Sequence, residues 1–199
     1  MQLIGISQEH FFGREGEYIP LLLDEGLDCL HLRKPHASLR EIEGLLKKIP
    51  SRLHGRIVLH DGFELLDRYG VKGIHLNRRN PSRPPGYDGY AGRSCHSVGE
   101  LATPEKLDYR FLSPLFDSLS KTGYRAGFSA EELDEAARKG LIGETTVALG
   151  GITPERLPEV KRLGFGGAAL LGYLWEQADP AELRKRMRLL LDFNRQLSK

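Results

Sequence analysis

Short apolar segments alternate with amphipathic segments along the whole chain. Thr145–Leu149 is typical of the first kind, because an apolar run with β-branched residues and turn formers at its ends predicts a buried strand. The second kind has apolar residues at helical spacing, such as Ile42, Leu45 and Leu46 after the candidate N-cap Ser38. The predicted strands are Gln2–Ser7, Asp28–Arg33, Arg56–Leu59, Gly73–Leu76, Tyr90–Ser94, Tyr109–Leu112, Thr145–Leu149 and Gly166–Leu171.

Helices are predicted between most of these strands. The predicted helices are Glu15–Glu25, Ser38–Ile49, one around Leu65 and Leu66, one ending near Leu101, one starting at Ser129, Pro154–Leu163, a short Gly172–Glu176 and Pro180–Gln196. Pro81–Gly89 contains three prolines and is predicted to be a loop in place of a helix. Ser113–Phe128 is the longest irregular segment, and loops of that length inside compact domains are usually functional or mobile.

This alternation predicts a compact α/β fold, a (β/α)8 TIM barrel, with residues 1–199 forming a single domain. A doubly wound open sheet is the alternative. That fold would normally place a glycine-rich phosphate turn after its first strand, where this chain has Gly5-Ile6-Ser7-Gln8. The glycines are instead concentrated after the last two strands, which favours the barrel.

Composition narrows the class of protein further. The 199 residues are 40% hydrophobic and 28% charged with a formal net charge of +2, which is ordinary for a globular protein and gives no electrostatic footprint for nucleic acid. Arg78, Arg79, Arg83 and Arg93 are close enough in sequence to share a local patch that would suit a small anion or remain solvated. The N-terminus lacks a signal-peptide pattern, and no apolar run is long enough to span a membrane. The two cysteines do not have the spacing of metal ligands. We therefore expect a reduced, cytoplasmic protein.

Two glycines follow the seventh predicted strand. Gly150-Gly151 leads to Thr153, a candidate N-cap, and to Pro154 at the first helical position. Glycines at such a junction let backbone N–H groups approach a phosphate, and a second glycine turn occurs at Gly172. The alternative is a turn that simply needs small residues.

Polar side chains cluster where the predicted strands end. In a parallel barrel all these ends face one mouth, so residues that are distant in sequence converge there. The clusters are Arg33 and Lys34, His60 and Asp61, Asn77 to Asn80, Ser94 and His96, and Ser113. Each has a simpler reading: Arg33 could be a solvated charge, Asp61 and His96 could cap turns, and His75 is better explained as a hydrogen-bonded core histidine. Together they favour an enzyme that handles phosphorylated substrates, with or without Mg²⁺.

The order and spacing of several motifs resemble one known family along nearly the whole chain. The motifs are His31-Leu32-Arg33-Lys34, Ile57-Val58-Leu59-His60-Asp61, Gly73-Ile74-His75-Leu76, Gly92-Arg93-Ser94-Cys95-His96-Ser97, Ser113-Pro114-Leu115-Phe116 through Lys121, and Ala148-Leu149-Gly150-Gly151-Ile152. By these motifs the chain resembles the thiamine phosphate synthases and their relatives, the thiazole tautomerases.

The resemblance implies a transferase of thiamine biosynthesis. Such a synthase joins a hydroxymethylpyrimidine pyrophosphate to a thiazole phosphate and releases pyrophosphate in the presence of Mg²⁺. The implied roles are catalytic for Arg33, Ser94 and Lys121; substrate-binding for His31, Lys34, His60, Arg79, His96, Ser118 and Ser120; phosphate-binding for Gly150, Gly151 and Gly172; and metal-binding for Asp61 and Asn80. We expect these small phosphorylated molecules as partners, with no nucleic acid or membrane, and a homodimer is compatible with the family.

Several positions depart from the family pattern. Asn80 stands where the resemblance implies a magnesium-binding aspartate, which would lower metal affinity, and Arg78 or Arg79 could neutralise pyrophosphate instead. A thiazole tautomerase needs no metal, but the histidine that its loop would carry is replaced by Ser113-Pro114, so His60, His75 or His96 would have to act. A non-catalytic barrel that binds a thiazole phosphate is the third alternative.

Overall fold

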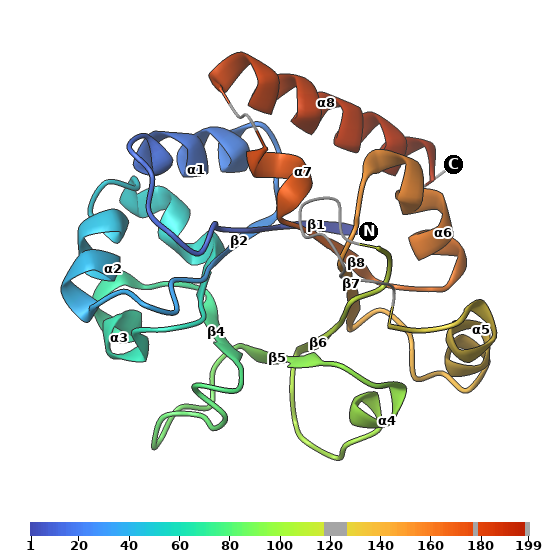
Figure 1. Cartoon of the computed structure of the whole chain (residues 1–199). Coiled ribbons are helices and arrows are strands. Elements are labelled where there is room, and N and C mark those ends of the chain that lie inside the picture. The colour runs from blue at the N-terminus through green and yellow to red at the C-terminus, as the bar shows by residue number, and fades with distance from the viewer. Residues whose placement is uncertain (118–126, 177–178, 198–199) are drawn as a thin grey trace.

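A computed structural model, which describes residues 1–117, 127–176 and 179–197, shows a closed barrel of eight parallel strands (Figure 1). Strand β1 pairs with β2 on one side and with β8 on the other, where Gln2 is the partner of Gly167. The strands are β1 Gln2–Ile6, β2 Cys29–Leu32, β3 Ile57–Leu59, β4 Gly73–Leu76, β5 Ala91–Cys95, β6 Tyr109–Leu112, β7 Thr146–Leu149 and β8 Gly167–Leu170. The predicted barrel is confirmed, and the open-sheet alternative is excluded.

Helices surround the barrel (Figure 1). They are α1 Glu15–Asp24, α2 Leu39–Leu46, α3 Leu66–Tyr69, α4 Val98–Leu101, α5 Ala130–Arg138, α6 Leu157–Arg162, α7 Gly172–Trp175 and α8 Pro180–Gln196, with short 3-10 turns η1 Ser51–Arg56, η2 Phe63–Leu65 and η3 Pro154–Arg156. The connection after β4 contains no helix over residues 81–89, as its prolines predict. No helix in the described ranges is long and apolar enough to cross a membrane.

Local sequence signals fix several helix ends. Ser38 and Ser129 each form a capping box with the glutamate three residues later, which satisfies two backbone donors at the start of α2 and α5. Thr153 occupies the predicted N-cap position with Pro154 after it, but its side chain caps no backbone N–H, and the segment starts as a 3-10 turn. The predicted helix therefore begins as η3 and continues as α6.

Strand alternation divides the core into two layers. Side chains facing outward pack against the helices; for example, Leu30 and Leu32 of β2 lie in the same cluster as Leu183 of α8. Side chains facing inward fill the barrel, and Cys29 of β2 packs there with residues such as Phe111 of β6. This period of two decides which residues at the carboxyl ends of the strands reach the mouth.

Candidate active site

A cavity of about 650 Å³ opens at the carboxyl ends of the strands. Its walls bring together residues from β1 through β7, so the convergence that we expected from the strand ends is observed. The predicted site residues among its lining are Arg33, His60, Arg79, Ser94 and His96. Arg78 and Arg93 also line it, and Arg93 is paired with Glu105 at 3.0 Å.

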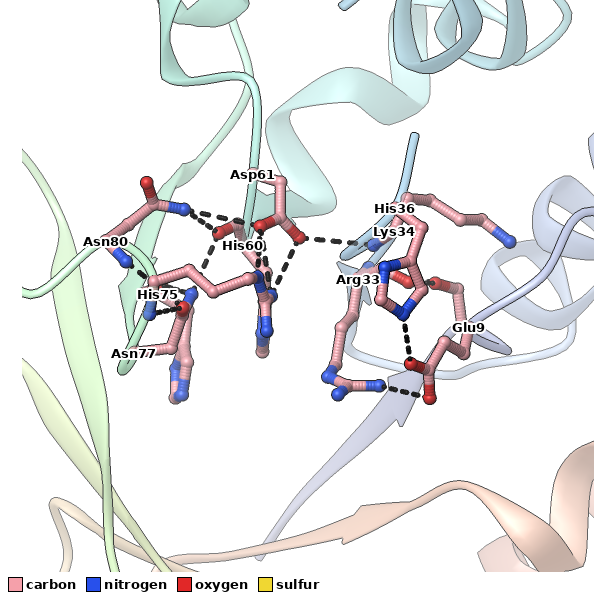
Figure 2. A network of polar contacts seen from close by, with 11 residues as sticks. Glu9, Arg33, Lys34, His36, His60, Asp61, His75, Asn77 and Asn80 are labelled. Carbon is pink, nitrogen blue, oxygen red and sulfur yellow. Dashed lines mark hydrogen bonds and ion pairs between the residues drawn. The ribbon is translucent and has the colours of Figure 1, made fainter. Parts of the chain in front are cut away.

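Asp61 is bound closely by the arginine that follows β4. Arg79 Nε lies 3.0 Å and Nη2 2.9 Å from Oδ1, and Nη2 lies 3.1 Å from Oδ2. The backbone N–H of Lys34 donates to Oδ2 at 3.3 Å (Figure 2). The carboxylate that was expected to hold a metal therefore holds a guanidinium, and the side chain of Asp61 is only 13% exposed.

Asn80 turns its amide nitrogen, not its carbonyl oxygen, towards this carboxylate. Nδ2 lies 2.9 Å from the backbone oxygen of His60 and 3.3 Å from Asp61 Oδ1 (Figure 2). Because both neighbours are acceptors, the amide must present its N–H groups here. Asn77 Nδ2 donates to the same His60 oxygen at 2.9 Å. The structure thus places Asp61 and Asn80 side by side, but Asn80 presents an N–H donor to the carboxylate and not the oxygen that a metal ligand would supply.

Arg33 faces the cavity and is held in place from β1. Ser7 Oγ accepts from the backbone N–H of Arg33 at 2.9 Å and donates to its backbone oxygen at 3.1 Å. The Arg33 guanidinium lies 3.3 Å from Glu9, which also lies 3.2 Å from His36 (Figure 2). The side chain of Arg33 is 33% exposed, so the guanidinium remains accessible to an anion.

The structure corrects the expectation for Lys34. Its ammonium is buried and lies 2.7 and 2.8 Å from the two carboxylate oxygens of Glu15, with further bonds to the backbone oxygens of Gln8 and His10. The side chain extends away from Asp61 (Figure 2). Alternation along β2 directs His31 inwards and Lys34 outwards, so Lys34 ties the segment after β1 to α1 and is not available to a substrate.

Three histidines pack together inside the barrel at the base of the cavity, which His60 lines. His31 Nδ1 lies 3.0 Å from His60 Nε2, and the His60 and His75 rings are stacked with centroids 4.2 Å apart. Burial is the main cause of low pKa values in all three. It lowers the pKa of His75 to about 3, and it holds the pKa of His31 and of His60 well below the usual value. All three are therefore neutral at pH 7. His31 lies beneath the cavity wall, which corrects its expected contact with substrate, and His75 is the core histidine that was predicted.

These histidines do not form a convergent metal site. Their candidate ligand atoms lie within 4.8 Å of one another. The His60 and His75 rings are within 15° of parallel, so their in-plane lone pairs cannot point at a common ion. Both ring nitrogens of His75 are also engaged, with Tyr109 and Ser94.

A hydrogen-bond relay connects the barrel interior to Ser94. Tyr109 Oη lies 2.9 Å from His75 Nδ1, and His75 Nε2 lies 2.9 Å from Ser94 Oγ. Among the described residues the buried Tyr109 hydroxyl has only this partner, so its hydrogen is satisfied by donating to Nδ1. Neutral His75 then donates from Nε2, and the Ser94 hydroxyl keeps its own hydrogen for a ligand in the cavity.

Tyr109 and Glu9 are two residues of this region that the sequence analysis missed. Tyr109 precedes Phe111 by two positions in the same strand, and that spacing is a signal that both face the interior. Glu9 has no comparable signal, because it lies in a segment between β1 and α1 with no periodic pattern.

His96 lies at the edge of the cavity. Its Nδ1 is 3.2 Å from the backbone oxygen of Ser113 and 3.4 Å from the Ser113 hydroxyl. Its backbone N–H donates to Glu100 at 3.0 Å. His96 thus joins the ends of β5 and β6 and is the exposed histidine of the cavity wall.

Gly150 and Gly151 have a steric reason to be glycine. Both have positive φ, 104° and 63°. A Cβ on Gly150 would lie 2.9 Å from Pro114 Cα, and one on Gly151 would lie 2.3 Å from the backbone oxygen of Asp117. The close packing of residues 114–117 therefore requires these glycines whether or not a phosphate binds. Gly172 begins the four-residue helix α7. Ser118, Ser120 and Lys121 lie outside the described residues.

Fold and cavity together define the class of protein: a (β/α)8 barrel with a cationic cavity at the end of the strands where barrel enzymes carry their active sites. Comparison with known proteins is more specific. The chain belongs to the thiamine monophosphate synthase family, whose model matches residues 3–174.

Relatives in sequence and structure agree. The putative thiamine-phosphate synthase of Geobacter sulfurreducens is 27% identical over 176 residues, which cover 83% of this chain and 82% of that protein. The crystal structure of thiamine phosphate pyrophosphorylase from Bacteroides thetaiotaomicron is 40% identical, with a TM-score of 0.88 and 98% of each chain covered. Thiamine phosphate pyrophosphorylase from Pyrococcus furiosus, at 20% identity and a TM-score of 0.79 with 100% and 97% covered, shares the fold.

Proposed function

We propose that this chain is a thiamine-phosphate synthase, a transferase that joins a hydroxymethylpyrimidine pyrophosphate to a thiazole phosphate and releases pyrophosphate. The proposal rests on one observation: the chain matches the synthase family, and its cavity has the side chains that phosphorylated substrates need. A chain that matches the synthase family over residues 3–174 has a cavity at the strand ends lined by four arginines. The substrates are small phosphorylated molecules, and guanidinium groups suit their phosphate oxygens.

The reaction needs a site that stabilises a leaving anion. The bond between the pyrimidine methylene carbon and the diphosphate oxygen breaks, and its electron pair leaves with pyrophosphate. The thiazole nitrogen then supplies the pair that forms the new carbon–nitrogen bond. Arg33 and Arg78 offer positive charge to the departing diphosphate, Arg93 lies beside them in its pair with Glu105, and Ser94 offers the hydroxyl hydrogen left free by the relay.

The apolar part of the cavity suits the pyrimidine that is left after pyrophosphate has departed. Leu76, Phe111 and Leu149 line it beside the arginines, and these apolar side chains would limit the access of water to a cationic intermediate. The thiazole phosphate would bind at the two glycines after β7 and at Gly172. The backbone at the end of β7 has positive φ and can present N–H groups to an anion. Ser118, Ser120 and Lys121 remain predictions.

The residues present do not fit the Mg²⁺ that the family resemblance implies. A divalent cation needs oxygen ligands, yet both oxygens of Asp61 already accept N–H donors and Asn80 presents its amide nitrogen. We therefore assign no step to a metal.

The relatives described above are named as synthases or pyrophosphorylases, which supports the synthase over the tautomerase and the binding-only barrel. The histidines add to this, since a tautomerase needs a residue that exchanges protons near neutral pH. Burial lowers the pKa of His60 and His75 far from that range, which makes these two poor general acids or bases and leaves His96 as the histidine of the cavity wall that a tautomerase would have to use.

Two assays on the purified protein distinguish these functions. In the first, the pyrimidine pyrophosphate and the thiazole phosphate are supplied together with Mg²⁺, and thiamine phosphate is measured by fluorescence after oxidation. In the second, the thiazole carboxylate phosphate tautomer is supplied alone. We expect product in the first assay and none in the second. Isomerisation without any thiamine phosphate would contradict the proposal.

A further inference from the structure

Asp61 has no free coordination left for a metal ion. Arg79 contributes three contacts of 2.9 to 3.1 Å to its two oxygens, and the Lys34 backbone and the Asn80 amide each add one at 3.3 Å. These donors come from the segments after β2 and β4, whereas Asp61 follows β3, so three neighbouring strand ends are joined at one carboxylate. A cation entering this position would have to displace a guanidinium from a largely buried carboxylate.

Arg79 still has donors to offer. Its Nε and Nη2 are used by Asp61, while Nη1 has no partner among the residues that the structure describes. The side chain is 38% exposed and lines the cavity together with Arg33, Arg78 and Arg93. One guanidinium can therefore contact the Asp61 carboxylate and a ligand oxygen at the same time, which is the bridging role that a metal ion has between a carboxylate and a phosphate.

We propose that this cavity binds the diphosphate group without a divalent cation, with Arg79 bridging Asp61 and a diphosphate oxygen and the other arginines completing the charge neutralisation. The inference deepens the proposed synthase function and rests on it for the identity of the diphosphate as leaving group. Asp61 acts here as a positioning residue that holds Arg79 in the cavity wall.

Binding of inorganic pyrophosphate, measured by calorimetry on the whole protein, tests this directly. In EDTA we expect wild-type protein to bind pyrophosphate within about threefold of the affinity measured with Mg²⁺. Mg²⁺ alone should give no measurable binding. Arg79→Ala should lower the affinity in EDTA by about 10- to 100-fold, the loss expected for charge-assisted hydrogen bonds. Mg²⁺ should partly restore binding in this variant, because Asp61 is then free to accept a cation.

Arg162→Ala is the matched control. Arg162 makes the same kind of pair with Asp134, at 2.8 Å, on the exposed surface away from the cavity. Its loss should leave pyrophosphate binding unchanged in both buffers. Circular dichroism on each variant checks that the fold is retained.

The outcomes separate this inference from the synthase function. Pyrophosphate bound only with Mg²⁺, with thiamine phosphate formed, overturns the inference and leaves the synthase standing. Pyrophosphate bound in EDTA through Arg79, with no thiamine phosphate formed, supports the metal-independent anion site and removes the proposed function. An Arg79→Ala variant that binds pyrophosphate in EDTA as tightly as the wild type also overturns the inference.

Discussion

Acidification should destabilise this barrel through the three histidines packed together in its interior. His31, His60 and His75 are buried and neutral in the folded chain, because burial holds the pKa of each below its ordinary value of 6.5. In the unfolded chain the same side chains bind protons once the pH falls below about 6.5. The unfolded state then binds more protons than the folded state, so stability is full above neutral pH and declines as the pH falls.

The size of the effect follows from linkage. About 1.5 pH units below the unfolded pKa, each histidine favours unfolding by about 2 kcal/mol. Three of them give about 6 kcal/mol at pH 5, relative to pH 8, if all stay neutral in the fold. Whole domains are stable by about 5–15 kcal/mol, so the loss should be a large fraction of the total.

Urea unfolding at pH 8 and pH 5 measures the loss, and one variant isolates its cause. His31→Phe keeps an aromatic ring against Phe111 and removes one titrating group, so the difference in unfolding free energy between the two pH values should shrink by about 2 kcal/mol. Val58→Ala is the control, because it weakens the same buried layer without removing a titrating group and should lower stability equally at both pH values. An identical pH difference in both variants would refute the reasoning.

Three further substitutions test other parts of the structure. Lys34→Met leaves the buried Glu15 carboxylate without its partner and should cost about 3–5 kcal/mol in urea unfolding, whereas removing both charges should cost less. Gly151→Ala places a Cβ against backbone at positive φ and should cost about 1–3 kcal/mol by the same assay; an unchanged midpoint would show that the turn relaxes freely. Tyr109→Phe removes the hydroxyl that begins the relay and should lower kcat/KM by about 3- to 10-fold with the pH profile unchanged. Ser94→Ala should lower kcat/KM by at least as much. If the Tyr109→Phe variant had the kcat/KM of the wild type, the relay would be excluded.

Alternation and capping made much of the fold predictable. Apolar runs separated by amphipathic segments gave the order of the strands, and Ser38 began its helix with the predicted cap. The pattern also identified His75 as a core residue. The same period of two, applied to the end of β2, would have separated Arg33 in the cavity from Lys34 in the outer layer. The prediction for Lys34 was wrong because the two adjacent charges, Arg33 and Lys34, were treated as one cluster facing the same side.

Pairing between loops was not predictable in the same way. Asp61 and Arg79 are 18 positions apart, and nothing local indicates that the guanidinium occupies the carboxylate. Side-chain contacts of this kind depend on how three strand ends are placed relative to one another. The double glycine at Gly150-Gly151 was ambiguous for another reason: packing against residues 114–117 and phosphate binding both require a residue without Cβ at positive φ.

The most direct test of the synthase account is product stoichiometry in a single reaction. The purified chain is incubated with a hydroxymethylpyrimidine pyrophosphate and a thiazole phosphate, and thiamine phosphate and pyrophosphate are quantified together. The account predicts that both appear in equal amounts and that neither appears when one substrate is omitted. Pyrophosphate release without thiamine phosphate, or no product under conditions where the folded protein binds both substrates, would contradict it.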